Sequence, residues 1–329
     1  MAFVHLHNHT EYSLLDGLTH IKDMVRRAAE LDMPAVAISD HGVMSGVPEL
    51  CDACAAVEKE TGKKVKPIYG CEVYFTTDEE LRKDVKPKLY HLLLLAKTNE
   101  GYHNLLNLVS ESHVDNFYYK PRTTFSMLQK YGKGIIGSSA CIAGIIPKLL
   151  DNRQFEEAVK WANKFASCFE PGDFYIELQN QGIRTDGGLT QTELNHQLTE
   201  VAHRAGLKTI ATNDFQEDAK AQDIMLCIGT GSAVNDTNRM KFENDQFYMK
   251  TEEEMREALR DFPEACDTTV EVAEKCNVIL ERDSILPKFP LPEGETDESW
   301  FRHQVLEGMK KRYGDPIPKE PLDRAEYEM

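Results

Sequence analysis

The chain has 329 residues, 41% of them hydrophobic, which is enough for one large barrel or for two domains. Its 38 basic and 55 acidic residues give a formal net charge of −17. This balance argues against tight duplex DNA binding by the chain alone, because phosphate neutralisation needs clustered lysine and arginine, but a short nucleotide end could still enter a cationic metal site.

Two further properties bear on the cellular setting. The apolar runs are far too short to span a bilayer, and polar histidines occupy the N-terminus where a signal peptide needs an apolar stretch. The C-x-x-C pair of Cys51 and Cys54 falls in a predicted helix, with no second pair at zinc-ribbon spacing. We therefore expect a soluble cytoplasmic protein with reduced core thiols and no membrane partner.

In chain order, short β-rich runs alternate with amphipathic helical patterns. The expected strands cover residues 3–7, 34–39, 65–75, 90–97, 134–138, 174–178 and 208–212. The expected helices cover residues 19–31, 47–60, 100–112, 123–130, 155–169, 191–205 and 218–227. About seven strands, nearly all followed by a helix, predict an α/β fold, either a βα barrel or an open parallel sheet.

The composition changes near residue 281. Six of the 14 prolines lie between Pro287 and Pro321, and residues 286–292 read as an extended connector. Residues 297–312 form one amphipathic helical pattern, and residues 322–329 begin another. Because the chain ends inside this pattern, we expect a fragment of a longer protein.

The N-terminal strand carries His5, His7 and His9 at alternate positions, followed by Asp16. In an extended strand such residues project from one face, about 6–7 Å apart. Imidazoles so placed can converge on one metal ion or on two adjacent ions. A solvent-facing histidine stripe on an edge strand is the alternative, and the apolar neighbours disfavour it.

Other polar residues follow the predicted strands, where βα folds gather functional groups. They are Asp40, His41, Cys141 and Asp214, together with Glu72, although Glu72 falls inside the long predicted strand at residues 65–75. Each has a simpler interpretation, since Asp40 and Asp214 could cap helices and Cys141 could be a buried thiol. His91 stands near the start of its strand, so the strand-end rule does not select it.

The residue types indicate the chemistry. Imidazoles suit Zn, Fe or Mn, carboxylates can bridge two ions, and a thiolate favours Zn. Two or three divalent ions about 3.5–4 Å apart could generate hydroxide at neutral pH and hold a phosphoryl oxygen. The constellation therefore predicts phosphoester hydrolysis.

Several motifs resemble the polymerase and histidinol phosphatase (PHP) domain, and more narrowly the PHP domain at the N-terminus of the bacterial DNA polymerase III alpha subunit. The general motifs are His7-Asn8-His9-Thr10 with Asp16-Gly17, Ser39-Asp40-His41-Gly42, Tyr69-Gly70-Cys71-Glu72, His91 to Lys97, and Ala211-Thr212-Asn213-Asp214. Those typical of the polymerase subgroup are Phe117-Tyr118-Tyr119-Lys120-Pro121-Arg122 and Ile228-Gly229-Thr230-Gly231. The resemblance covers almost the whole chain.

The resemblance implies a distorted seven-stranded, TIM-like βα barrel over residues 1–278 and a connector toward a polymerase palm over residues 279–329. It implies a cluster of two to three divalent ions. The ligands carried over by motif position are His7, His9, Asp16, His41, Glu72, His91, Cys141 and Asp214. The resemblance adds His91 to the candidate ligands and removes His5 from them. The sequence departs from the family pattern at one position, because Gln216 stands where the family has histidine.

The function that the resemblance implies is 3′–5′ exonuclease proofreading during DNA replication. Its partners would be a single-stranded DNA 3′ end, the remainder of the polymerase and the replisome subunits, while the polymerase active site would lie outside this chain. The alternatives are a metal-stabilised scaffold without turnover, motivated by Gln216, and a small-molecule phosphatase of the histidinol phosphatase type. A thiol hydrolase built on Cys141 is disfavoured by its flanking sequence.

Overall fold

The computed structural model describes residues 2–14, 17–81, 87–213, 219–239, 244–281 and 286–329. The chain divides into two compact units, residues 1–280 and residues 281–329. The first unit contains the sheet and most of the helices, and the second contains two helices.

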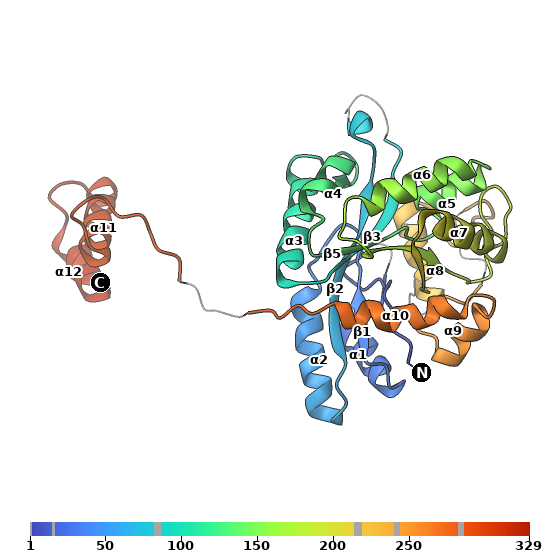
Figure 1. Ribbon diagram of the computed structural model, residues 1–329. Helices are drawn as coiled ribbons and strands as arrows, with labels where there is room; N and C mark the ends of the chain where they lie inside the picture. Colours follow the sequence, from blue (N-terminus) through green and yellow to red (C-terminus); the bar gives the residue numbers. More distant parts are fainter. Residues whose placement is uncertain (1, 15–16, 82–86, 214–218, 240–243, 282–285) are drawn as a thin grey trace. The chain divides into compact units, whose positions relative to one another are not determined.

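The first unit is an α/β fold around one seven-stranded sheet, as the sequence predicted. The strands are β1 Ala35–Ile38, β2 Lys66–Phe75, β3 Tyr90–Ala96, β4 Arg122–Thr123, β5 Ile135–Ser138, β6 Phe174–Leu178 and β7 Lys208–Ala211. Their order is β1-β2-β3-β5-β6-β7, with β4 paired to β2. The sheet is mostly parallel and curls as a distorted, half-open barrel of the TIM-like type (Figure 1).

Strand β3 is the exception to the parallel arrangement, because it pairs antiparallel with both β2 and β5. Tyr90, at its beginning, lies opposite Phe75 at the end of β2. The start of β3 therefore lies at the sheet edge where the parallel strands end.

The two faces of the sheet are filled by alternating side chains. In β3, Leu92 and Leu94 join the larger hydrophobic cluster, whereas Leu93 and Leu95 join a smaller one. Strand β1 repeats the pattern, with Val36 in the larger cluster and Ala37 in the smaller. The runs are uniformly apolar because both faces are buried, which is typical of sheets covered by helices on each side.

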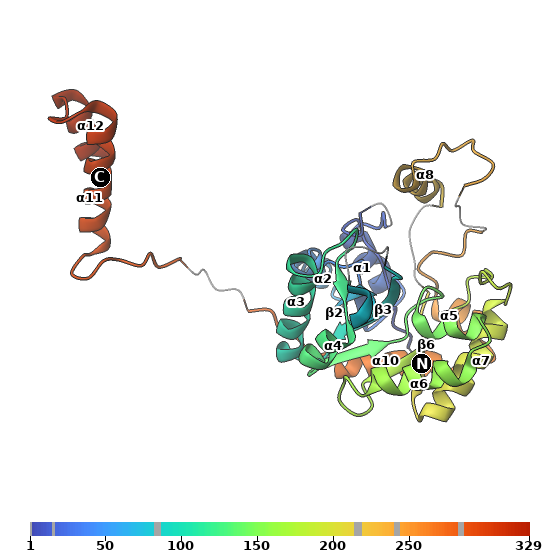
Figure 2. The ribbon, with the colours of Figure 1, turned by 90° about the horizontal axis from the view of Figure 1, so that it is seen from above.

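Helices connect and cover the strands. They are α1 Ile21–Glu30, α2 Val47–Thr61, α3 Asn99–Val114, α4 Phe125–Tyr131, α5 Ile145–Asp151, α6 Phe155–Ala166, α7 Gln191–Ala205, α8 Ala219–Thr230, α9 Glu252–Ala258 and α10 Pro263–Lys275, with a 3₁₀ turn at Asp78–Leu81. Helices α3 and α4 gather at one end of the first unit and α5, α6 and α7 at the other (Figures 1 and 2), and buried residues of all five belong to the larger hydrophobic cluster. Helix α10 packs on β7.

The N-terminal segment differs from its prediction. Residues 3–7 are extended and buried but do not form a regular strand. The segment lies beside β1, where Ala37 N donates to His5 O at 3.1 Å and Ser39 N donates to Asn8 O at 2.9 Å. These two hydrogen bonds attach the segment to the edge of the sheet beside β1.

The second unit contains α11 Asp297–Tyr313 and α12 Lys319–Glu328. Thr296 and Ser299 form a capping box at the start of α11, and Arg302 pairs with Glu326 across the two helices. Among the helices in the described part of the chain, none has the length and apolar character that crossing a membrane requires.

Candidate metal centre

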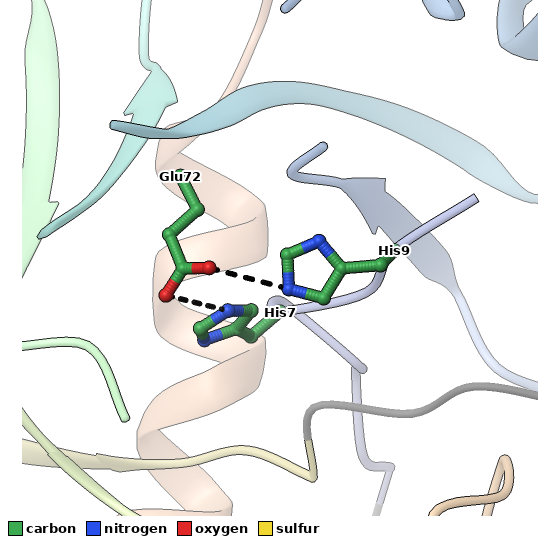
Figure 3. Close-up of side chains that lie close together, drawn as sticks. All are labelled: His7, His9 and Glu72. Atoms are coloured by element: carbon green, nitrogen blue, oxygen red, sulfur yellow. Dashed lines mark ion pairs between the residues drawn. The ribbon is translucent and has the colours of Figure 1, made fainter. Parts of the chain in front are cut away.

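Glu72 lies at the centre of a cluster of histidines. Its Oε1 is 3.3 Å from His7 Nε2 and 3.2 Å from His91 Nδ1. Its Oε2 is 3.3 Å from His9 Nε2 and 2.9 Å from His41 Nδ1. Figure 3 shows His7 and His9 converging on the two carboxylate oxygens. The cluster contains two groups of possible metal ligands that share Glu72, one with His7 and His9 and one with His41 and His91.

Three segments meet at Glu72 through the backbone. Gly42 N donates to Glu72 O at 2.9 Å, and Glu72 N donates to Ser39 O at 3.1 Å, which fixes the loop after β1 against β2. Gly70 lets β2 pack closely, because a Cβ there would lie 2.7 Å from Leu94 O in β3. Glu72 and the loop that carries His41 are thus held in register.

His91 reaches the centre because β3 is reversed. It lies opposite Tyr74, two residues beyond Glu72 on β2, and its backbone N donates to Ala143 O at 3.2 Å. The strand-end rule failed for His91 only because it assumed that every strand runs the same way.

Cys141 lies at the rim of the same cluster. Its Sγ is 3.5 Å from His91 Nδ1 and 3.7 Å from Glu72 Oε1. Ala140, just before it, adopts a left-handed φ of 57°, which turns the chain sharply after β5. The geometry places the thiol beside the group formed by His41, Glu72 and His91.

The charges in the cluster are coupled. Burial raises the pKa of the Glu72 carboxyl, but the positive fields of His91, His41 and His7 outweigh burial and hold it well below its usual range. Burial lowers the pKa of His7, yet the Glu177 and Glu72 carboxylates raise it well above the usual value. An ion binding here must displace a proton from His7, so its affinity depends on pH.

Glu177 is a functional candidate that the sequence reasoning missed. It is fully buried in β6 and accepts from His7 Nδ1 at 2.6 Å, Ser138 Oγ at 2.5 Å, Thr212 Oγ1 at 2.5 Å and Gln179 Nε2 at 3.0 Å. Because Glu177 accepts a hydrogen bond from His7 Nδ1, the Nε2 atom of His7 is the one that faces Glu72 and would bind a metal ion. The feature of the sequence that could have identified Glu177 is a charged residue inside a short buried strand.

Two observations indicate that the cluster fits divalent metal ions. His7 Nε2 and Glu72 Oε2 are buried and make no hydrogen bond within the described chain, as expected of atoms that complete their shells with an ion. The donors are imidazole nitrogens, a carboxylate and a nearby thiol, a set that suits Zn, Mn or Fe. Sharing of Glu72 between the two groups is the arrangement of a bridging carboxylate.

Not every predicted residue joins the cluster. His5 Nε2 lies 3.0 Å from Lys250 O, and His5 belongs to neither ligand group. Asp40 binds instead the loop after the N-terminal segment, accepting from Thr10 N at 2.7 Å and from Ser13 Oγ at 3.2 Å. Asp16, Asp214 and the Gln216 departure lie outside the described residues, so their roles stay predictions.

The comparisons with known proteins agree with one another. Residues 5–181, more than half of the chain, match the model of the PHP domain. DNA polymerase III subunit alpha of Borreliella burgdorferi is 41% identical over 337 residues, which cover 99% of this chain and 28% of that protein. The corresponding subunits of Treponema pallidum and Thermus aquaticus are 37% and 36% identical, covering 100% and 96% of this chain but 28% and 26% of theirs. The chain thus spans about a quarter of the length of these relatives, and it belongs to the PHP domain family.

Proposed function

We propose that this chain is a metal-dependent phosphodiesterase that removes nucleotides from the 3′ end of single-stranded DNA, as a proofreading exonuclease in replication. The observation that carries the proposal is Glu72 surrounded by His7, His9, His41 and His91 at 2.9–3.3 Å. The match to DNA polymerase III alpha subunits favours DNA over a small phosphate ester as substrate. It also supports the remaining polymerase and replisome subunits as partners in the cytoplasm, with residues 279–329 leading toward a palm.

Two to three divalent ions, Zn, Mn or Fe, are proposed as cofactors. The proposed ligands are His7, His9, Asp16, His41, Glu72, His91, Cys141 and Asp214. The chemistry that bound ions supply is acidification of water and neutralisation of charge on the phosphoryl group.

The residues of the chain have distinct proposed roles. Glu72 bridges the two ligand groups, and Glu177 orients His7. His41 and His91 are the accessible imidazoles of the described cluster, with side chains 15% and 23% exposed, so either of them, when it is not fully engaged by a metal ion, is placed to move a proton between the site and solvent. The buried pair, His7 and His9, is placed for ligation alone.

A nuclease assay with the 329-residue chain tests this proposal. With Mn²⁺ or Zn²⁺, the chain should release mononucleotides from the 3′ end of labelled single-stranded DNA, and a chelator or His9→Ala should abolish release. His203→Ala, an exposed histidine on α7, is the matched control and should leave activity unchanged. Equal release by the wild type and His9→Ala would overturn the proposal.

The second candidate function is a metal-stabilised scaffold without turnover. Gln216 favours it, because an amide oxygen is a weaker ligand than the imidazole that the family has at this position. In this case metal would raise the melting temperature while no nucleotide is released. A melting temperature that is indifferent to chelator would count against it.

A further inference from the structure

A cavity of about 390 Å³ opens beside the metal centre. One of its lining residues is His41, which also lies 2.9 Å from Glu72. His7 and His9 are fully buried, whereas His41 and His91 are partly exposed, so among the described ligands the centre is reached past His41 and His91. A cavity of this volume accepts a ligand about the size of one nucleotide.

The cavity wall combines one exposed cation with aromatic and apolar side chains. Lys120 Nζ lies 5.0 Å from the ring centroid of Tyr74, and that ring stacks on His41 at 5.4 Å. Lys120 is exposed, and no carboxylate in the described chain forms an ion pair with it. A lysine that is one aromatic ring away from a metal-ligand histidine is placed for an anion beside the centre, in a protein whose net charge is −17.

The segment that presents Lys120 is held firmly. Tyr119 has a left-handed φ of 62°, which is costly for a bulky residue, and Tyr118 N donates to Lys120 O at 3.1 Å across the resulting turn. Arg122 anchors the segment, since its Nε donates to Asn116 O at 2.8 Å. Pro121 packs on Gly42, where a Cβ would come within 2.8 Å of the proline ring.

Other lining residues of the cavity are apolar or aromatic. Leu14 is 84% exposed and lines the cavity. Tyr12 and Val43 line the same cavity, and Tyr12 is fixed by donating to Glu49 Oε2 at 2.8 Å. Single-stranded nucleic acids are bound by this combination, in which a lysine contacts the backbone and apolar or aromatic side chains contact a base.

We propose that this cavity is the subsite for the nucleotide next to the scissile phosphodiester. Lys120 Nζ binds the neighbouring phosphate, and Tyr12, Leu14 and Val43 contact the base. Because the Tyr74 ring contacts both His41 and Lys120, Lys120 serves a phosphate adjacent to the centre and leaves the scissile one to the metal ligands. The inference rests on the proposed function for its substrate, but the binding it describes can be measured without hydrolysis.

Binding of a short phosphorothioate oligothymidylate, which resists hydrolysis, tests the Lys120 contact. Fluorescence anisotropy with the 329-residue chain, with and without Mn²⁺, should show roughly ten-fold weaker binding for Lys120→Gln, and the salt dependence of log Ka should become shallower by about 0.7. Lys160→Gln, an exposed lysine on α6 that pairs with Glu157 at 3.0 Å, is the control and should bind like the wild type. Equal binding by wild type and Lys120→Gln, or no binding by the wild type, would overturn the proposal.

The base contact has its own variant. Leu14→Ala removes an exposed side chain, so folding should be unaffected, and it should weaken binding of the oligothymidylate by about three-fold, because an aliphatic contact with a base is weaker than aromatic stacking. With an oligonucleotide whose penultimate unit, on the 5′ side of the scissile linkage, is abasic, the same variant should bind like the wild type. An equal loss with both oligonucleotides would contradict a base contact.

Hydrolysis of bis(p-nitrophenyl) phosphate, which has one phosphate and no base, separates the two proposals. Lys120→Gln should leave kcat and KM for this substrate unchanged while raising KM for the oligonucleotide. An equal loss on both substrates would assign Lys120 to the centre itself and overturn the subsite. If the wild type hydrolyses neither substrate, the proposed function fails, and the binding measurements still decide the subsite.

Discussion

The two halves of the metal centre differ in how they are supported. His7 and His9 are fully buried, and His7 is held from behind by Glu177, which three further side chains orient. His41 and His91 are partly exposed and contact the ring of Tyr74 at the mouth of a cavity. Glu72 belongs to both halves.

This difference separates ligand positioning from substrate access. A buried imidazole fixed by a carboxylate has one orientation and one basic nitrogen available for metal. An imidazole at a cavity wall can meet both metal and substrate. We therefore expect changes in the closed half to act on metal affinity, and changes around the open half to act on substrate binding.

The largest effect should come from Glu72→Gln, which removes the charge that both halves share. We expect hydrolysis to fall by about 1000-fold or more, since a bridging ligand and its charge are lost together. Metal content by elemental analysis should fall in parallel. Glu271→Gln, a carboxylate paired with Lys208 away from the centre, is the control. Normal metal content in Glu72→Gln would contradict the role given to Glu72.

Removal of metal should give the next largest effect. At a free ion concentration about 1000 times Kd, binding stabilises the folded chain by about 4 kcal/mol. Chelation should therefore lower the melting temperature by about 10 °C in a unit of this size. The Glu72→Gln variant should melt at one temperature with and without chelator, and an equal fall in the variant would place the stabilising ion elsewhere.

Glu177→Gln should act on the closed half alone. Loss of the charge behind His7 Nδ1 should weaken metal binding by roughly 10- to 100-fold, while KM for oligonucleotide stays close to that of the wild type. Asp173→Asn is the matched control, because this buried carboxylate lies just before β6 and pairs with Lys97 at 2.6 Å. It should lower stability without changing metal affinity. A change in KM with unchanged metal affinity would contradict the positioning role of Glu177.

These residues mark how far the sequence could predict the site. His7, His9, His41, Glu72 and Cys141, which were selected from the sequence, lie together in the structure, although Glu72 is inside β2 and not beyond its end. Only the family resemblance identified His91 as a ligand, because a run of leucines does not reveal that β3 runs in the opposite direction.

Glu177 was missed for a different reason. Residues in the ligand motifs are recognised by spacing, whereas Glu177 acts through His7, which is 170 positions away in the chain. Its partners Ser138 and Thr212 are 39 and 35 positions away. Only the curled sheet brings these residues together. The alternating α/β fold was therefore predictable from the sequence, but the contacts through which Glu177 orients His7 were not.

The smallest effect should concern His5, which alternates with His7 but lies outside the ligand groups. Burial lowers the pKa of His5 to about 4, from 6.5. As the pH falls, His5 takes up a proton in the unfolded chain before it does so in the folded chain. The contribution of neutral His5 to the free energy of unfolding is therefore fully present above pH 6.5 and is lost as pH falls toward 4. At pH 5 the loss should reach about 2 kcal/mol.

Urea denaturation of metal-free protein at pH 7 and pH 5 measures this effect. His5→Phe, which can pack against Phe3, should lose less stability than the wild type between the two pH values. Metal content at pH 7 should not change. An unchanged pH dependence in His5→Phe would show that His5 is not the titrating group.

The central claim is that Glu72 and the four histidines bind divalent ions. Anomalous scattering from a crystal of the chain loaded with Mn²⁺ tests it most directly. The account predicts peaks at about 2.0–2.2 Å from ligand nitrogen and oxygen atoms of these residues, with Glu72 bridging two of the peaks. Anomalous peaks confined to surface carboxylates, with Glu72 still paired directly to the histidines, would contradict it.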